Sequence, residues 1–280
     1  MTGRGTPSTR AGAGQSSAAS RRRDKGADRV FLTGASSGIG AALARHYAAQ
    51  GASVGLFARR LDALAGLAED IPAERCAIYA GDVRDSSALD RAAREFIARF
   101  GSPTAVVANA GVSLGVLTER SEDLPVFREV LETNVVGMVN TFAPFIAAMR
   151  SAGGGTLAGI ASVAGFRGLA GSGAYSASKA AAITYLESLR LELRDSKIAV
   201  VTICPGYIAT PMTATNPYRM PFLLEPQKAA RLIARAIDER KRFYVLPWQM
   251  AIAGFVLRRL PRPIYDAVFA RAPRKARGGS

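Results

Sequence analysis

The chain has 280 residues, 49% of them hydrophobic, which suffices for one large α/β domain with a sizeable buried core. Its two cysteines, Cys76 and Cys204, each lie inside an apolar run, which does not fit a small disulfide-rich secreted protein and favours a reducing, cytoplasmic setting. The formal net charge is +15, but residues 1–29 carry +5 and residues 240–280 carry +9, so the body between them is nearly neutral.

Residues 1–28 are predicted to form a disordered basic tail. They are rich in Gly, Ser, Ala and Arg and contain no large apolar residue after Met1, so they cannot bury enough surface to fold. A transit peptide is the alternative, because Arg and Ser are plentiful, but an amphipathic transit helix needs apolar residues. No 18-residue apolar span free of charges occurs, so no transmembrane helix is predicted.

From residue 29 onward, short apolar runs alternate with longer stretches of helical period. Strict alternation of strand and helix indicates right-handed crossovers and a parallel sheet covered on both faces. The sequence therefore predicts a single doubly wound, Rossmann-type α/β domain over residues 29–246, with ligands bound beyond the carboxyl ends of the strands. The expected strands are 30–32, 53–57, 76–79, 105–108, 156–161, 198–204 and 243–246, and the expected helices are 39–50, 61–68, 86–100, one that ends near 150, 174–194 and 227–239.

The first predicted strand runs into a glycine-rich turn and then directly into a helix. Glycines allow a sharp turn and let the backbone approach a pyrophosphate, whose charge is stabilised at the helix N-terminus. Alone, such a turn can also serve packing only. Its residues are Thr33, Gly34, Ala35, Ser36, Ser37, Gly38, Ile39 and Gly40.

Four further motifs follow the later strands in a fixed order. They are Asn109-Ala110-Gly111 after the fourth strand, Asn134 in the next helix, Ser162 at the end of the fifth strand with Tyr175-Ser176-Ala177-Ser178-Lys179 opening the helix after it, and Pro205-Gly206-Tyr207-Ile208-Ala209-Thr210 after the sixth strand. Together with the glycine-rich turn, this set resembles the short-chain dehydrogenase/reductase family over residues 29 to about 246. The resemblance implies an oxidoreductase that interconverts a carbonyl and a secondary alcohol by hydride transfer with a nicotinamide cofactor.

Tyr175 and Lys179 are four residues apart and so share one helix face, which places an ammonium near the phenol. A free phenol has a pKa of about 10, and a nearby cation favours the phenolate, which moves the group toward neutral pH. The alternative is a solvated surface pair. The resemblance implies that Tyr175 is the general acid/base, that Ser162 binds the substrate oxygen, that Lys179 also holds the nicotinamide ribose, and that Asn134 supports a water that relays protons. Asn134 could instead be a helix-kink residue without a catalytic part.

The end of the second strand indicates which cofactor binds. NAD-preferring family members carry an acid there for the adenosine ribose, whereas this chain has Ala58 followed by Arg59 and Arg60. A guanidinium can bind a 2′-phosphate by donating charge-assisted hydrogen bonds to it, so NADP(H) is favoured over NAD(H). The alternative is that both arginines are solvated and contact no cofactor. The resemblance places Asp82 and Val83 at the adenine. It also makes Asn109, Ala110, Gly111, Pro205 and Gly206 cofactor-binding, with Ile208 and Thr210 at the nicotinamide carboxamide.

Other chemistry finds little support in the sequence. His46 is the only histidine and has no cysteine or acid cluster around it, so no metal site is predicted, and Ser36 has no histidine partner for hydrolase chemistry. The basic ends could contact nucleic acid, but no recognition motif is present. A non-catalytic nucleotide-binding regulator or scaffold with the same fold remains the alternative function.

Substrate and partners are indicated only coarsely. The segment 211–226 offers Met212, Met220, Phe222, Leu223 and Leu224, which suggests an apolar carbonyl or alcohol substrate, unless these side chains simply pack on the body. Family members are commonly oligomers, so a homo-oligomer is expected.

Residues 247–280 are predicted to form an amphipathic, basic C-terminal extension. Trp248, Ile252, Phe255 and Val256 recur at helical spacing beside several arginines, a pattern typical of a helix lying on an anionic membrane. The alternative is that this helix packs over the substrate pocket or a subunit interface.

Overall fold

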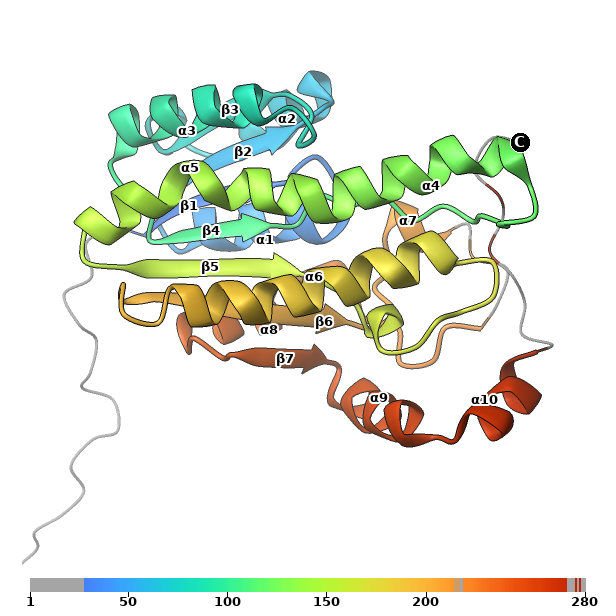
Figure 1. Cartoon of the computed structure of the whole chain (residues 1–280). Helices are drawn as coiled ribbons and strands as arrows, with labels where there is room; N and C mark the ends of the chain where they lie inside the picture. The colour runs from blue at the N-terminus through green and yellow to red at the C-terminus, as the bar shows by residue number, and fades with distance from the viewer. Residues whose placement is uncertain (1–27, 215, 217–218, 271–274, 276, 278–280) are drawn as a thin grey trace, which may run out of the picture.

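The computed structural model describes residues 28–214, 216, 219–270, 275 and 277. Its centre is a seven-stranded sheet in the order β3-β2-β1-β4-β5-β6-β7, in which every neighbouring pair is parallel (Figure 1). This topology confirms the predicted doubly wound Rossmann-type fold. The strands are β1 (Arg29–Thr33), β2 (Ser53–Ala58), β3 (Cys76–Ala80), β4 (Ala105–Ala108), β5 (Gly155–Ile160), β6 (Ile198–Pro205) and β7 (Phe243–Leu246).

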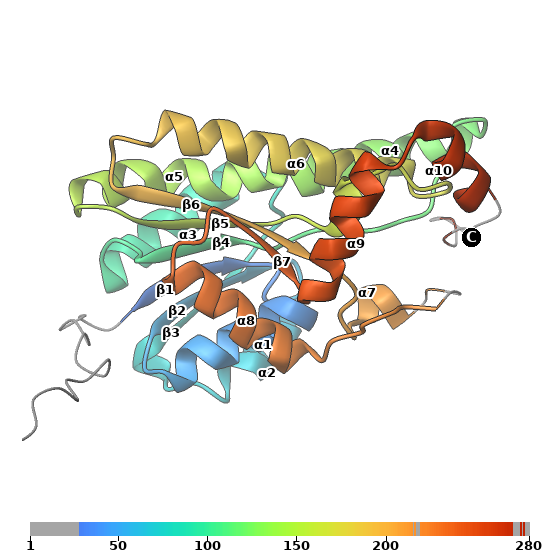
Figure 2. The same ribbon diagram turned by 90° about the horizontal axis from the view of Figure 1, so that it is seen from below.

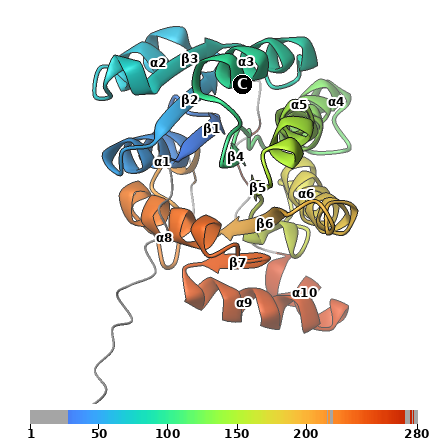
Figure 3. The ribbon, with the colours of Figure 1, turned by 90° about the vertical axis from the view of Figure 1, so that its left-hand side faces the viewer.

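Helices cover both faces of the sheet (Figure 3). One face carries α1 (Gly38–Ala49), α2 (Leu61–Ala68) and α8 (Pro226–Asp238), and the other carries α3 (Ser86–Phe100), α4 (Leu124–Leu131), α5 (Gly137–Ser151) and α6 (Gly173–Glu192). Short helical turns connect these elements at η1 (Ala73–Arg75), η2 (Ser121–Asp123), η3 (Glu132–Val136) and η4 (Val163–Gly165). Beyond the sheet lie α7 (Pro211–Ala214), α9 (Trp248–Arg259) and α10 (Arg262–Phe269).

Two hydrophobic cores, one on each face, hold the layers together. Side chains alternate along β1, so Val30 and Leu32 join the core under α1 and α8, whereas Phe31 joins the core under α3 and α5. Phe31 lies at the centre of an aromatic cluster, with ring centroids 4.7 Å from Phe145 and 5.6 Å from Phe96. Burial of the sheet on both faces explains why its strands are continuous apolar runs.

The region predicted as one long helix ending near residue 150 contains three elements. The α4 helix leads into the π-helical turn η3, and α5 then continues to Ser151. The whole run Ser121–Ser151 is long and apolar enough, by length and composition, to cross a membrane. Phe142, Phe145 and Met149 of this run are fully buried in the core, so it packs as a core helix of the α/β domain.

Two expectations on the chain ends have different outcomes. The tail predicted over residues 1–28 lies, except for Asp28, outside the described residues. The helix predicted from the spacing of Trp248, Ile252 and Phe255 is α9. A second helix, α10, was not predicted from the sequence; Pro261 precedes it and Pro263 lies in its first turn, where a missing N–H costs no hydrogen bond.

Candidate active site

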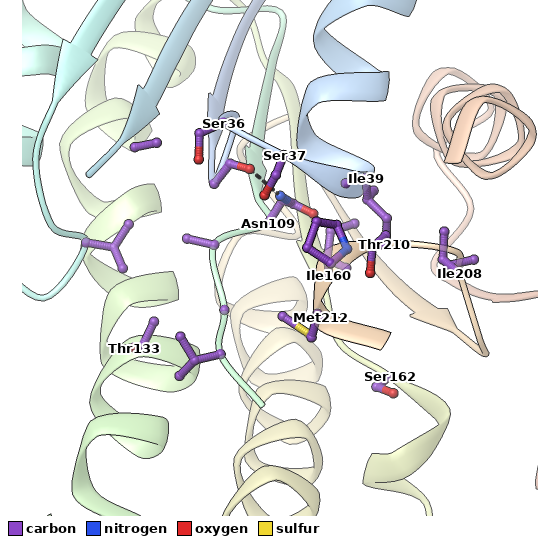
Figure 4. Close-up of a pocket in the computed structure, with 18 of the residues that line it drawn as sticks. Ser36, Ser37, Ile39, Asn109, Thr133, Ile160, Ser162, Ile208, Thr210 and Met212 are labelled. Carbon is purple, nitrogen blue, oxygen red and sulfur yellow. Dashed lines mark hydrogen bonds between the residues drawn. The ribbon is translucent and has the colours of Figure 1, made fainter. Parts of the chain in front are cut away.

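A cleft of about 330 Å³ opens at the carboxyl ends of the strands, where the strand order reverses between β1 and β4. In Figure 4, Ser36, Ser37 and Asn109 lie at one end of this cleft and Ser162 lies at the other. Of the residues predicted to be catalytic or cofactor-binding, Asn134 and Gly40 do not line it and the others do. Those that do are Gly34, Ser36, Ser37, Gly38, Ile39, Arg59, Arg60, Asp82, Val83, Asn109, Ala110, Gly111, Ser162, Tyr175, Lys179, Pro205, Gly206, Ile208 and Thr210.

The glycine-rich turn depends on its glycines for two physical reasons. Gly34 and Gly38 have φ of +66° and +55°, in the left-handed region that other residues rarely adopt. A Cβ on Gly34 would lie 2.7 Å from Cα of Ala110, and one on Gly40 would collide with the Gly34 carbonyl. Ser37 precedes α1 but makes no side-chain cap hydrogen bond. The N-terminus of α1, whose Gly38 and Ile39 line the cleft, therefore has no side-chain cap, which leaves its first backbone N–H groups for an anion.

Asn109 ties this turn to the end of β4. Its Nδ2 donates to the carbonyl oxygens of Thr33 (3.1 Å) and Gly34 (3.2 Å), and the latter bond is drawn in Figure 4. Its backbone N–H donates to Oγ1 of Thr33 at 3.2 Å. Asn109 thus fixes the spacing between the two loops that flank the reversal of strand order.

The end of the cleft near β2 and β3 carries several charged side chains. Arg60 donates from Nη2 to Oγ of Ser36 at 3.1 Å, so a guanidinium lies beside the glycine-rich turn. Arg84, which the sequence reading did not single out, binds the Asp82 carboxylate at 2.7 and 3.0 Å and lowers its pKa. Asp82 therefore lines the cleft as an ion-paired carboxylate, with Arg59 as a second nearby cation.

Lys179 is the most unusual charged group in the site. It is fully buried on α6, and its Nζ donates to the Ile160 carbonyl at 2.8 Å. The Nζ atom lies 5.8 Å from the centroid of the Tyr175 ring, so the predicted proximity of ammonium and phenol is present. Burial lowers the pKa of Lys179 to about 8, because an apolar surrounding disfavours its charged form.

Ser162 and Asn134 are held by short hydrogen-bond networks. Ser162 Oγ accepts from the Ala164 N–H at 3.1 Å and lies 3.5 Å from the Pro205 carbonyl, which keeps it between β5 and β6. Asn134 is buried in the π-helical turn η3, where its amide exchanges bonds of 2.8 and 2.9 Å with the backbone of Val112 and donates to Ser178 Oγ at 2.9 Å. Such π-turns occur frequently at functional sites.

Several residues that line the cleft were not found from the sequence. They are Gly81, Val112, Thr133 and Ile160, whereas the lining residues Pro211, Met212 and Thr213 belong to the segment 211–226 that the sequence indicated for the substrate. A usable signal existed for Gly81 and Ile160, since each lies at or just after a strand's carboxyl end. Of the apolar residues named in this segment, Met212 lines the cleft and Leu224 is buried, whereas Phe222 and Leu223 are exposed.

Comparisons with known proteins give the family and the fold of the chain. The family model described as short chain dehydrogenase matches residues 28–219. An uncharacterized oxidoreductase of Myxococcus xanthus is 38% identical over 86% of this chain and 96% of its own length, and a sulfoacetaldehyde reductase of Chromohalobacter salexigens is 34% identical over 66% and 74%. The crystal structure of a short-chain dehydrogenase from Streptomyces avermitilis superposes with a TM-score of 0.73 at 29% identity, covering 88% of this chain and 95% of that one.

Proposed function

Because the chain belongs to the short-chain dehydrogenase family, it is an oxidoreductase acting on CH–OH or carbonyl groups with a nicotinamide cofactor, and we propose that it prefers NADP(H). On this proposal it interconverts a carbonyl and a secondary alcohol on an apolar substrate, with Tyr175 as the general acid/base. The observation that carries the proposal is the shared cleft: Ser162, Tyr175 and Lys179 line its one end, and the glycine-rich turn with two arginines lines the other.

The residues of the cleft fit a dinucleotide. The left-handed glycines and the uncapped N-terminus of α1 would hold the pyrophosphate, and a side chain on Gly34 would push against the Ala110 backbone and distort this turn. Arg59 and Arg60 would bind the 2′-phosphate, because Ala58 stands where an acid would repel it. We assign the remaining predicted contacts by resemblance, with Asp82 and Val83 at the adenine and Ile208 and Thr210 at the carboxamide.

The proton is the part of the chemistry that the chain's own side chains handle. When bound, the nicotinamide donates or accepts the hydride. Ser162 would hold the substrate oxygen, and the Tyr175 hydroxyl would give it a proton in reduction or take one in oxidation. With a pKa of about 8, Lys179 is still mostly protonated at pH 7, so its positive charge favours the phenolate. Asn134 would position the relay, since its amide is held by Val112 and Ser178.

A panel of carbonyl compounds tests the proposed activity. Purified protein is mixed with NADPH or NADH, and consumption is followed at 340 nm against aliphatic, aromatic and polycyclic ketones and aldehydes. We expect turnover of apolar members with NADPH, with a lower kcat/KM for NADH. Equal use of both cofactors would refute the NADP(H) assignment. Tight NADPH binding without turnover of any carbonyl or alcohol would instead support the non-catalytic regulator.

The outer face of the C-terminal extension is a candidate for contact with a partner. Trp248, Ile252 and Phe255 of α9 are 67%, 56% and 57% exposed, and Ile264 and Val268 of α10 are also exposed. The inner face packs on the body, because Met250 lies at Gly206 and Gly254 contacts the Phe166 ring. The exposed apolar row therefore does not cover the cleft.

We propose that this row lies on an anionic membrane surface, because the exposed arginines Arg259 and Arg262 flank it and complement such a surface. The full chain should co-sediment more strongly with vesicles containing phosphatidylserine than with neutral ones. The double variant Ile252→Asn/Phe255→Ser should stay in the supernatant. Failure of the unmodified chain to sediment at low salt would refute the proposal. Loss of a dimer in light scattering of the same variant would show instead that a second copy covers this face, as the expected homo-oligomer would allow.

A further inference from the structure

The C-terminal segment contacts the loop that follows β4, far away in the sequence. Arg277 Nη2 lies 2.8 Å from Asp123 Oδ1 and 3.1 Å from Glu122 Oε1, and its Nε lies 3.1 Å from Asp123 Oδ2. Arg277 also forms a parallel β-bridge with Gly115. Two residues earlier, Lys275 Nζ donates to Ser113 Oγ at 2.8 Å. The segment is thus attached by a forked ion pair, a backbone bridge and a further hydrogen bond.

Asp123 is a nearly buried residue that binds both Arg277 of the C-terminal segment and the loop that follows β4. Its side chain is only 4% exposed, and Oδ2 also accepts the backbone N–H of Leu117 at 2.8 Å. The guanidinium of Arg277 lowers the pKa of Asp123, so the carboxylate stays charged at neutral pH. Without Arg277, this nearly buried carboxylate would keep the Leu117 N–H but lose its main counter-charge.

The same loop forms a wall beside Tyr175. Val116 pairs with Ser172, the residue that precedes α6, and its N–H donates to the Gly171 carbonyl at 3.1 Å. Val116 and Ala174 belong to a small apolar cluster against which the Tyr175 ring packs. Val112, at the start of this loop, lines the cleft and holds the Asn134 amide. The contacts therefore run without a gap from Arg277 to the residues around Tyr175.

Helices α9 and α10 form hydrogen bonds with a second loop, the one between Ser162 and α6. Tyr265 Oη donates to the Gly168 carbonyl at 2.6 Å, and Arg167 donates to the carbonyls of Leu257 and Leu260 at 3.2 and 3.1 Å. This loop leads from Ser162 to α6. Both helices lie at the end of the molecule toward which the strands point (Figures 1 and 2). The extension thus contacts both loops that flank the acid/base end of the cleft.

We propose that Arg277 is a positioning residue for substrate binding: through Asp123 it fixes the loop 112–117 as one wall of the substrate site beside Tyr175. The inference rests on the proposed function for its kinetic consequence, but not for its structural one. It also assigns α9, α10, Lys275 and Arg277 to the substrate-binding part of the enzyme, and it does not require them to contact the cofactor.

Hydrogen–deuterium exchange of the full chain tests the structural part without any substrate. Arg277→Ala should speed exchange in peptides covering 112–117 and 171–174 by at least about tenfold, while peptides of β1 and α1 stay unchanged. Arg262→Ala is the matched control, because it removes an exposed arginine of the same extension for which the described residues show no ion pair. Unchanged exchange in Arg277→Ala would overturn the inference, whether or not a carbonyl substrate is found.

Kinetics with a substrate from the carbonyl panel test the functional part. Arg277→Ala should raise KM for the carbonyl by about tenfold, a loss of about 1.4 kcal/mol in binding, with kcat within threefold and the Kd for NADPH unchanged. Arg277→Lys should restore only part of the carbonyl binding lost in Arg277→Ala. Lysine keeps the positive charge, but its ammonium cannot form the forked pair that the guanidinium makes with Asp123. Asp123→Asn combined with Arg277→Ala should be no worse than the more damaging single change. Additive effects of the two changes, or equal losses of NADPH and carbonyl binding, would contradict the proposed route.

Discussion

Replacement of Lys179 by methionine should make the protein more stable and at the same time inactive. The pKa of Lys179 falls from 10.5 to about 8 on burial, which corresponds to about 3 kcal/mol against the charged form in the folded state. Methionine has a similar length and no charge, so it removes this cost, although the Ile160 carbonyl loses its partner at a cost of about 1–2 kcal/mol. The net gain at pH 7 is about 1–2 kcal/mol, or roughly 2–8 °C in Tm for a domain of this size.

The pH dependence of this gain separates the charge from other effects. Because the folded pKa is depressed, the unfolded chain binds more protons between pH 8 and 10.5, so the unmodified protein gains stability as pH rises through that window. The advantage of Lys179→Met should therefore be largest below pH 8 and shrink toward pH 10. Thermal unfolding of both proteins without cofactor measures it, with Lys228→Met on the exposed face of α8 as control. A Lys179→Met protein that is less stable at every pH would refute the reasoning.

Three further changes test individual parts of the site. Tyr175→Phe should lower kcat by about 10²–10⁴-fold with the Kd for NADPH within twofold, measured by nicotinamide fluorescence; an active variant would exclude Tyr175 as proton donor. Arg59→Ala should weaken NADPH binding by about 1.5–3 kcal/mol and leave NADH binding unchanged, as calorimetry can show. Gly34→Ala should abolish binding of both cofactors and lower Tm, because its Cβ would lie 2.7 Å from the Ala110 backbone at a φ of +66°; normal binding would mean that the turn relaxes freely.

The fold could be predicted because its signal is local. Each strand is a short apolar run followed by a helical period, and alternation of this kind permits few topologies. At Asn134 the sequence suggested a helix kink as an alternative but not a π-helical turn, and the bonds of Asn134 to Val112 and Ser178 join residues distant in the sequence, which no local pattern indicates. The helix α10 was missed because two prolines near its start are also typical of a loop.

The candidate site was accessible to the sequence only where residues act in short motifs. A glycine-rich turn between a strand and a helix has a predictable backbone shape, and the spacing of Tyr175 and Lys179 predicts that they share one helix face. The structure places both motifs on one cleft. Arg84 and Arg277 have no motif. Each matters through an acidic partner, and for Arg277 that partner, Asp123, lies 154 residues away. Burial of Asp123 depends on the completed fold, so no pattern along the chain could have indicated it.

Net charge also needs the structure before it can be interpreted. Residues 240–280 carry a formal +9, but Arg277 is ion-paired and the Arg258 guanidinium lies 4.1 Å from the centroid of the Phe166 ring. Arg259, whose guanidinium lies 3.7 Å from the centroid of the Phe255 ring, and Arg262 lie beside the exposed row of α9, and at about 1 kcal/mol each near an anionic surface they supply about 2 kcal/mol. Insertion of a side chain such as Trp248 or Phe255 supplies about 1.5–3 kcal/mol when complete. Vesicle binding should therefore respond weakly to salt, falling less than about tenfold between about 0.1 and 0.5 M, and strongly to loss of apolar side chains. Binding that salt abolishes and the Ile252→Asn/Phe255→Ser change leaves intact would place the contact on the basic residues instead.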